Sequence, residues 1–389
     1  MTESPLPESA LPESPPSARQ TPLAGVHERL GATMTEFAGW RMPLRYGSET
    51  AEHQAVRTAS GLFDLSHMGE LTVTGAQAGE ALDYALVGQP SALRPGRARY
   101  TMICAADGGV LDDLIVYRLA DAEFMVVANA ANTAVVSREL TARAAGFAAT
   151  VTDATTDYAL IALQGRTSAA ILATVTDTDL ATVKYYASQR AAVCGQEVLL
   201  ARTGYTGEDG FEMFCAPGDA VALWDGLTAA GDGHGLVPAG LAARDTLRLE
   251  AGMPLYGNEL GPDMTPFDAG LGRVVKLDKP GDFVGRAALS EAAERPPRRV
   301  LAGLTSRSRR IPRHGYAVLW DGRPCGTVTS GAPSPTLGVP IALAYLDPEA
   351  AGLAAGQGGD AGDSKLTIDI RGRGEPADLV PLPFYTRSK

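Results

Sequence analysis

Three strand-like segments joined by short turns are the feature that most constrains how this chain can fold. RYTMIC (99–104) is followed by AADGG, VLDDLIVYRL (110–119), ADA and EFMVVAN (123–129). Asp107 and the two glycines after it tolerate the positive φ angles that tight turns require. We therefore expect three consecutive strands joined by two tight turns.

A second hairpin and two helices are predicted from similar signals. EVLLAR (197–202) and FEMFCA (211–216) are the hairpin strands, with TGYTGEDG between them. ETAEHQAVRTAS (49–60) is followed by Gly61 as a stop signal, and AGLAARDTLRLEAG (239–252) begins after a proline and ends on a glycine. This punctuation is typical of helix ends.

A change of composition predicts a domain boundary near residue 295. AAERPPRRV (292–300) has two prolines, and the short strands beyond it, such as YAVLW, GTVTS and LTIDIRG, are broken by Gly and Pro. The 44 Gly and 26 Pro also indicate many turns and a sizeable β content. We predict one region at 21–295, a small all-β domain at 296–389, and a flexible surface loop at 354–364.

The first 20 residues, MTESPLPESALPESPPSARQ, hold five Pro, three Glu and one Arg. They lack the apolar core of a secretory signal and the Arg-rich character of a transit peptide, so residues 1–20 are predicted to be a disordered, acidic, Pro-rich tail. The four cysteines are far apart and form no CxxC pair, which predicts reduced thiols in a cytoplasmic protein. No apolar run approaches the length of a membrane span, so we expect no membrane partner.

Charge and missing motifs exclude several function classes. The chain has 34 Lys and Arg against 45 Asp and Glu, a net charge of −11, which argues against broad nucleic-acid binding. GxGxxG, GxxxxGK[ST], HExxH and GxSxG are all absent, so nucleotide cradles, zincins and hydrolase nucleophile elbows have no support. With five scattered His we also expect no metal site.

The Asp112-Asp113 pair interrupts a strand that is otherwise apolar on both faces. Neighbouring strand residues point to opposite sides, so at least one carboxylate faces the interior or a cavity, where its pKa is open to tuning. If Asp113 faces inward, Ile115 and Tyr117 share its face and form a wall suited to a flat polar ligand. The alternative is a pair near the turn that is hydrogen-bonded to loop amides.

Other polar residues have both a functional and a structural interpretation. Glu212 alternates with Phe211 and Met213 and can accept two N–H bonds from a planar heterocycle, or simply face solvent. Arg244 and Arg248 lie on one helix face, where Arg244 can clamp a carboxylate or ring carbonyl, or belong to an ordinary surface arrangement. Glu208 and Asp209 sit in the turn and are expected to be solvated.

A further set of residues is weaker when taken singly. Met68, Tyr100 and Asn129 can line the same pocket, although each is equally typical of core or turn. The segment 295–313 carries seven Arg in an otherwise acidic protein. It can steer an acidic partner, or it can be a solvated domain edge.

Taken together, these segments resemble one family, the T protein (aminomethyltransferase) of the glycine cleavage system. The matching stretches are TPLAGVHERLGATMTEFAGWRMPLRYGS, EHQAVRTASGLFDLSHMGE, GGVLDDLIVYR, VVANAAN, LQG, TGYTGEDGFE, GLAARDTLRLEAGMPLYGNEL and GTVTSGAPSPTLG. They run in order over nearly the whole chain. The resemblance implies an α+β, three-domain cloverleaf, with two α+β domains and a small C-terminal β-barrel domain around a central folate site.

The resemblance also implies an activity and its partners. The family transfers the methylene carbon of an aminomethyl group, held on the lipoyl arm of the H protein, to tetrahydrofolate. The products are 5,10-methylenetetrahydrofolate, ammonia and the dihydrolipoyl H protein. Tetrahydrofolate is a co-substrate, and neither metal nor flavin is implied. The Arg-rich segment 295–313 is a candidate docking surface for the typically acidic H protein.

Site residues follow from the family motifs. The second Asp of G-G-x-x-D-D falls on Asp113, which is implied to promote attack on the aminomethyl carbon. Glu212 and Arg244 match the groups that hold the pterin end. Other implied pocket positions are Met68, Tyr100, Ile115, Tyr117, Asn129 and Tyr205. The family also uses a residue near its C-terminus, but PFYTRSK does not align cleanly with it.

Two alternatives stay open at the level of sequence. One is a folate-dependent demethylase, or a domain related to dimethylglycine or sarcosine oxidases. An oxidase needs a flavin domain, and a demethylase is expected to depart from the pattern at RLEAGMPLYGNEL. The other is a non-enzymatic folate-binding protein of iron–sulfur assembly, whose KGC-type motif has no match here.

Overall fold

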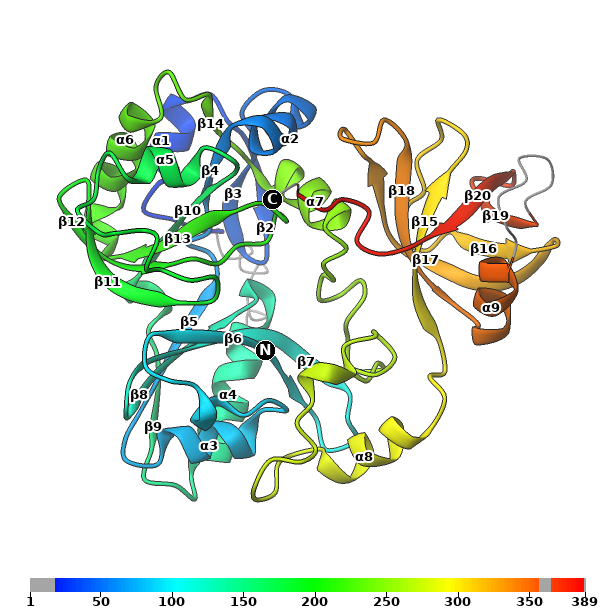
Figure 1. Ribbon diagram of the computed structural model, residues 1–389, viewed down its shortest axis with the longest axis horizontal. Helices are drawn as coiled ribbons and strands as arrows, with labels where there is room; N and C mark the ends of the chain where they lie inside the picture. Colours follow the sequence, from blue (N-terminus) through cyan, green and yellow to red (C-terminus); the bar gives the residue numbers. More distant parts are fainter. Residues whose placement is uncertain (1–17, 357–364, 388–389) are drawn as a thin grey trace, which may run out of the picture.

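The computed structural model describes residues 18–356 and 365–387 and contains two α+β units and a closed barrel (Figure 1). Most of the predicted tail lies outside the described residues, but its last part was assigned wrongly. Arg19–Gln20 forms strand β1, parallel to β3 (Trp40–Arg45). The Arg19 guanidinium lies 4.3 Å from the ring centre of Trp40, and this contact helps to hold the segment in place. β2 (Thr33–Phe37) completes a three-stranded sheet.

The first α+β unit is a five-stranded sheet in the order β6-β7-β8-β5-β9. Its strands are β5 (Gly69–Thr74), β6 (Arg97–Cys104), β7 (Val110–Ala120), β8 (Glu123–Ala128) and β9 (Thr150–Asp153). Helices α3 (Ala78–Ala85) and α4 (Thr133–Ala144) share a hydrophobic cluster with one face of this sheet. The three predicted strands are therefore confirmed as β6, β7 and β8.

The second α+β unit is a six-stranded sheet in the order β11-β12-β13-β10-β4-β14. Its strands are β4 (Ser60–Asp64), β10 (Ala159–Gln164), β11 (Ser188–Val193), β12 (Gln196–Ala201), β13 (Gly210–Cys215) and β14 (Leu236–Pro238). Helices α1 (Ala24–Arg29), α5 (Ser168–Leu172) and α6 (Ala220–Ala230) share its outer cluster. The predicted second hairpin is confirmed as β12 and β13.

One hydrophobic cluster joins the two sheets. Tyr117 and Met125 of the first sheet meet Leu160 and Phe214 of the second. Because successive strand residues alternate between faces, the strands that carry these residues contribute to the shared cluster with one side and to their own helical layer with the other. The joint between the two sheets therefore lies beside the Asp113 strand, which carries Tyr117.

Two further helices cover this joint, α2 (Glu49–Thr58) and α7 (Leu241–Glu250). The predicted helix over 49–60 is correct in type, but it ends two residues early because Ser60 already begins the buried strand β4. Gly61 lies in that strand and is not a helix stop. A Cβ on Gly61 would lie 2.6 Å from the Val56 side chain, so the close approach of α2 to β4 requires glycine here.

A long irregular segment leads from α7 to α8 (Arg286–Glu294) and packs against β6 and β7. The turn before β7 fits tightly beneath it, since a Cβ on Gly109 would lie 2.0 Å from the carbonyl oxygen of Pro262. The division of the chain that the sequence predicts after residue 295 falls between α8 and the first barrel strand.

The C-terminal part is a closed six-stranded barrel in the order β15-β18-β17-β16-β19-β20, closed by pairing of β15 with β20. Its strands are β15 (Val300–Ser306), β16 (Ala317–Trp320), β17 (Arg323–Pro333), β18 (Pro340–Leu346), β19 (Leu366–Asp369) and β20 (Gly374–Val380). Of the predicted loop at 354–364, the first three residues belong to helix α9 (Pro348–Gly356), and the rest lie outside the described residues. Figure 1 shows the barrel beside the two α+β units, with α7 between them.

The described residues include no helix that is long and apolar enough to cross a membrane. The four cysteines, Cys104, Cys194, Cys215 and Cys325, are all unpaired.

Candidate functional site

A cavity of about 510 Å³ opens between the two α+β units and the segment that follows α7. Its walls come from β6 and β7, the loops after β4 and β8, the loop before β13, and α7. All nine residues that the sequence singled out line this one cavity: Met68, Tyr100, Asp113, Ile115, Tyr117, Asn129, Tyr205, Glu212 and Arg244. Residues from seven separate loops, strands and helices thus converge on one space of a size typical for small-molecule sites.

Asp113 is half-buried in the cavity wall, and its hydrogen-bond donors are neutral. The Tyr100 hydroxyl donates to Oδ2 at 3.0 Å, and the Asn129 side-chain amide donates to Oδ1 at 2.8 Å. Burial raises the pKa of Asp113, and these two hydrogen bonds partly offset the effect. No ion pair to Asp113 occurs among the described residues. The carboxyl group is therefore suited to exchanging a proton.

Asp112 is fully buried and does not line the cavity. It accepts hydrogen bonds from the backbone and side chain of Asn129 and from the side chain of Asn132. Burial raises the pKa of Asp112 to about 7, and the neighbouring Asp113 adds to the shift. Strand alternation left open which aspartate faces inward, and the structure places Asp113 in the cavity wall with Ile115 and Tyr117, the two residues expected to share its face.

Glu212 is a buried carboxylate on another wall of the cavity. Its Oε2 accepts hydrogen bonds from the Thr203 hydroxyl and, at 3.5 Å, from the Tyr117 hydroxyl. Among the described residues no donor reaches Oε1. Burial raises the pKa of Glu212, against the opposing effects of Thr203 and the positive charge of Arg244. Glu212 therefore keeps an acceptor oxygen for a ligand.

Arg244 carries a positive charge in the cavity wall. Its guanidinium lies 4.8 Å from the ring centre of Tyr205, whose hydroxyl donates to the carbonyl of Pro254. Within the described chain no hydrogen bond or ion pair uses the Arg244 donors. Stacking of this kind fixes the plane of a guanidinium and leaves its N–H groups directed elsewhere. The donors of Arg244 are thus available to an anionic or carbonyl group of a ligand.

Comparison with known proteins identifies the family. A family model described as the GCVT N-terminal domain matches residues 23–279, and one described as the glycine cleavage T-protein C-terminal barrel domain matches residues 299–386. The chain belongs to the glycine cleavage T-protein family.

Individual relatives of the T-protein family agree over nearly the full length. A protein of Saccharopolyspora erythraea named aminomethyltransferase is 63% identical over 96% of this chain and 99% of its own. One of Streptomyces coelicolor with the same name is 62% identical over 95% of this chain and 98% of its own. The crystal structure of glycine cleavage system aminomethyltransferase T from Bartonella henselae is 37% identical, with a TM-score of 0.85, and covers 95% of this chain and 98% of that one.

The T-protein fold of this chain also brings residues to the cavity that were not predicted to line it. They include Phe37, Leu65, His67, Tyr186, Asp245 and Tyr256, together with Arg248, which the sequence placed only on the same helix face as Arg244. His67 is buried, its Nδ1 has no hydrogen-bond partner, and burial and Arg244 lower its pKa to about 4. The signal that could have identified His67 is its position directly before Met68, which was predicted to line the pocket. Tyr186 and Tyr256 carry no local pattern that distinguishes them from other tyrosines.

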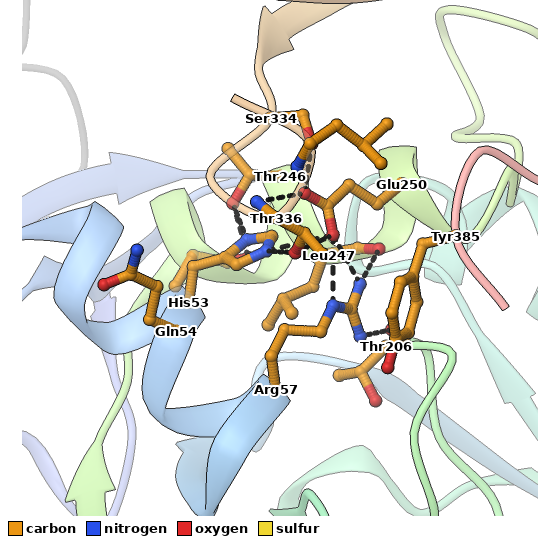
Figure 2. Close-up of polar contacts among 12 residues, drawn as sticks. His53, Gln54, Arg57, Thr206, Thr246, Leu247, Glu250, Ser334, Thr336 and Tyr385 are labelled. Carbon is orange, nitrogen blue, oxygen red and sulfur yellow. Dashed lines mark hydrogen bonds and ion pairs between the residues drawn. The ribbon is translucent and has the colours of Figure 1, made fainter. Parts of the chain in front are cut away.

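A buried cluster around Glu250 joins α2, α7 and the barrel (Figure 2). Its Oε2 accepts hydrogen bonds from Arg57 Nε and Nη2, both at 3.0 Å, and contacts His53 Nε2 at 3.0 Å. In the connection between β17 and β18, the Thr336 hydroxyl donates to the same oxygen at 2.7 Å, and the Ser334 hydroxyl donates to Oε1 at 2.5 Å. We call these five residues the Glu250 cluster. They fasten the barrel to the helix that carries Arg244.

The Glu250 cluster extends to the turn before β13 and corrects one prediction. Glu208 was expected to be solvated, but it is buried and accepts a hydrogen bond from Arg57 Nη1 at 3.0 Å. The cation that buries it comes from α2, far away in sequence. Asp209 is half-buried and pairs with Arg202 at 2.6 Å. At the C-terminus, the Tyr385 ring packs 4.1 Å from the Arg57 guanidinium, and its backbone N–H donates to the carbonyl of Glu250 (Figure 2).

No described residue of the barrel lines the cavity, but the barrel contacts residues that do. Arg248, the second arginine of α7, is buried and pairs with Glu259 at 3.1 Å. The Ser330 hydroxyl of the barrel accepts hydrogen bonds from Arg248 at 2.8 Å and from Asn258 at 3.0 Å. Arg248 also pairs with Asp245 at 2.8 Å, so this arginine is held by groups of α7, the following segment and the barrel.

Within residues 18–356 and 365–387, no group of three or more His, Cys, Asp or Glu side chains is placed to hold a metal ion.

Proposed function

We propose that the cavity binds tetrahydrofolate and that Asp113 acts there in transfer of the methylene carbon of an aminomethyl group. The chain is an aminomethyltransferase of the glycine cleavage system, as its family membership and its full-length relatives establish. In the proposed reaction the aminomethyl group arrives on the lipoyl arm of the H protein. The observation that carries the proposal is the Asp113 carboxyl group, held in the cavity wall by neutral donors.

The other walls suit a pterin. Tyr100, Tyr117 and Tyr205 provide flat aromatic surfaces around the cavity. The unused Oε1 of Glu212 can accept N–H bonds from the amidine edge of the heterocycle, and Arg244 can donate to its carbonyl oxygen. Met68, Ile115 and Asn129 complete the proposed folate-binding set. One acceptor and one donor at fixed positions favour a single orientation of the ring.

The proposed chemistry balances as follows. Two C–N bonds form between the methylene carbon and the two reacting folate nitrogens, while the bonds from that carbon to the amine nitrogen and to the lipoyl sulfur break. The two folate N–H protons leave, one to the departing amine to give ammonia and one to the sulfur to give the dihydrolipoyl arm. Asp113 accepts and returns a proton in this exchange and stabilises the cationic carbon centre.

The test is turnover of the purified full-length protein with aminomethylated H protein and tetrahydrofolate. We expect ammonia and 5,10-methylenetetrahydrofolate in equal amounts. Ammonia release that does not depend on tetrahydrofolate would contradict the proposal. Turnover of an N-methylated substrate in place of the H protein would favour the demethylase alternative. A crystal structure with bound folate, in which a folate nitrogen lies beside Asp113, is the direct structural test.

We also propose that the H protein docks on the arginines of segment 295–313. Arg295, Arg298, Arg299, Arg307, Arg309, Arg310 and Arg313 are all exposed. Two of them have acidic neighbours in the barrel, since Arg310 pairs with Glu375 at 3.0 Å and Arg307 with Asp378 at 2.7 Å. An acidic partner would be attracted to this surface, because it is rich in arginine while the chain as a whole is acidic.

Charge reversal tests the docking surface. Arg309→Glu with Arg310→Glu should weaken H-protein binding several-fold, and added salt should weaken binding to the wild type more than to the variant. Arg138→Glu, on the exposed side of α4, is the matched control. Equal affinity of the wild type and the double variant for the H protein would show that the segment is a solvated domain edge and not a docking surface. A cytoplasmic location is a further part of the proposal, supported by the four unpaired thiols.

A further inference from the structure

Asp112 is a fully buried carboxylate that does not line the cavity. The Asn129 backbone donates to its Oδ2 at 3.0 Å, and the side-chain amides of Asn129 and Asn132 donate to its Oδ1 at 2.9 and 2.6 Å. No cation pairs with it among the described residues. Burying a carboxylate with neutral partners alone is unfavourable for folding, so packing does not explain an acid at this position.

The Asn129 side chain connects Asp112 to Asp113. Its Nδ2 donates to Asp112 Oδ1 at 2.9 Å, to Asp113 Oδ1 at 2.8 Å and to the Asp113 carbonyl at 3.2 Å. All three partners are acceptors. A primary amide can rotate by half a turn and present its carbonyl oxygen instead, but here that orientation would bring oxygen against oxygen.

The Asp112 side chain accepts hydrogen bonds from Asn129 and Asn132 and does not line the cavity. We propose that Asp112 is a positioning residue that, through Asn129, keeps a hydrogen-bond donor aimed at the Asp113 carboxylate. The inference rests on the proposed function, in which Asp113 exchanges protons with the substrates. The Asn132 side-chain amide donates to the same oxygen, Asp112 Oδ1, and so helps to fix the atom that Asn129 meets.

Asparagine at position 112 tests this role because it keeps the size and replaces one acceptor oxygen by an NH₂ donor. An amide there can present its own NH₂ to Asn129, so the Asn129 amide is free to turn and to direct its carbonyl oxygen at Asp113. Asp113 then loses one of its two donors and faces a repelling oxygen. The reacting carboxylate is misoriented while the walls of the cavity stay in place, so we expect a slower chemical step with little change in folate binding.

The experiment compares the wild type with Asp112→Asn, Asn129→Ala and the double variant. The measurements are kcat for ammonia release from aminomethylated H protein, Kd for tetrahydrofolate, and the melting temperature. We expect Asp112→Asn to lower kcat on the order of ten- to a hundredfold and to leave Kd within about threefold. The double variant should be no slower than Asn129→Ala alone, because both changes remove the same hydrogen bond to Asp113.

Asp83→Asn is the matched control. This half-buried carboxylate on α3 accepts hydrogen bonds from Ser91 at 2.5 and 2.9 Å and lies outside the cavity, so the same chemical change should leave kcat unaltered. A folded Asp112→Asn protein with kcat within twofold of the wild type would overturn the proposal, as would losses that multiply in the double variant. If Asp112→Asn does not fold, Asn129→Ala is the deciding variant. A kcat of Asn129→Ala within twofold of the wild type would show that the hydrogen bond from Asn129 to Asp113 is not needed, and this would overturn the proposal. An inactive wild type would instead refute the proposed function, so the two failures are distinguishable.

Discussion

Two groups of buried carboxylates in this molecule behave in opposite ways. Asp112 and Glu250 are both fully buried, yet the pKa of Asp112 is raised to about 7 and that of Glu250 is lowered to about 2. Burial raises the pKa in both cases. Asp112 has amide donors only, whereas Glu250 also has His53 and Arg57. The difference teaches that the partners of a buried acid, more than its depth, decide whether it exchanges protons or holds a permanent charge.

The two groups also differ in what they connect. The aspartate pair lies on β7 and is hydrogen-bonded to Asn129 in the loop that follows β8, and Asp113 lines the cavity. The Glu250 cluster joins three elements distant in sequence and includes a loop of the barrel. Substitutions in the first group should therefore alter rate, and those in the second should alter stability.

The largest expected effect is loss of activity in Asp113→Asn. The amide keeps the size and can still accept from Tyr100, but it cannot take up a proton from a folate nitrogen. We expect kcat to fall by about two to four orders of magnitude, the usual contribution of general acid–base catalysis. The measurement is ammonia release at saturating substrates, with the melting temperature recorded in parallel.

Asp121→Asn is the control for this experiment. Asp121 lies in the turn at the other end of β7, and its side chain is 95% exposed, so neither rate nor stability should change. Unchanged ammonia release in Asp113→Asn would remove the assigned role of Asp113. A large drop in melting temperature would place Asp113 with the structural carboxylates and so erase the contrast between the two groups.

The residues of the cavity were easier to predict from the sequence than those of the Glu250 cluster, for physical reasons. The strand around Asp113 is a local pattern, and its alternation assigned Ile115 and Tyr117 to the same face. Glu208 was misjudged because its partner Arg57 is 151 residues away, and a turn residue looks solvated until such a cation is known. Local patterns thus specify strands and faces, while long-range ion pairs depend on how the units pack.

The same limit applies to helix ends and to glycines. The sequence predicted the type and approximate extent of α2 and α7 from flanking Gly and Pro, which are local signals. It misread Gly61 as a helix stop because the close approach of Val56 is a tertiary feature. The family motifs supplied Tyr205 and Asn129 as pocket positions, which the residue pattern alone left ambiguous.

The second largest effect is loss of stability in Glu250→Gln. The substitution removes the counter-charge of Arg57 and leaves a buried guanidinium without full compensation. Breaking a buried pair in this way costs about 3–5 kcal/mol of unfolding free energy. The measurement is urea unfolding followed by circular dichroism.

Glu349→Gln, at an exposed position of α9, is the matched control and should leave the unfolding midpoint in place. The folded fraction of Glu250→Gln should bind tetrahydrofolate with a Kd close to that of the wild type, because Glu250 does not line the cavity. A variant as stable as the wild type would contradict the role of the cluster as a fastening between barrel and α7.

The pH dependence of stability should have opposite signs in the two groups. The lowered pKa of Glu250 means that its contribution is present above its ordinary value of 4.5 and is lost as the pH falls towards 2. The raised pKa of Asp112 means that the folded state favours the protonated acid. Its contribution is therefore greatest below 3.8 and is lost as the pH rises through about 7.

Unfolding free energies at several pH values separate these contributions. The cost of Glu250→Gln should shrink by about 3 kcal/mol between pH 7 and pH 2. Asp112→Asn should gain stability relative to the wild type as the pH rises from 4 to 8. Parallel profiles for the wild type and both variants would show that neither carboxyl group has a shifted pKa.

The smallest effects come from deleting one hydroxyl group in each region. Tyr100→Phe removes a donor to Asp113, and Ser334→Ala removes a donor to Glu250. Each change deletes one hydrogen bond to an acidic group, worth about 1.5–3 kcal/mol when that group is charged.

If the two regions differ in this way, the same chemical change should lower kcat roughly tenfold in Tyr100→Phe and leave its melting temperature unaltered. In Ser334→Ala it should lower the unfolding free energy by about 1–2 kcal/mol and leave kcat unaltered, because Arg57 and Thr336 still hold the Glu250 carboxylate. Measuring both quantities on both variants gives four values, and a Tyr100→Phe protein that loses stability instead of rate would break the distinction at its most sensitive point.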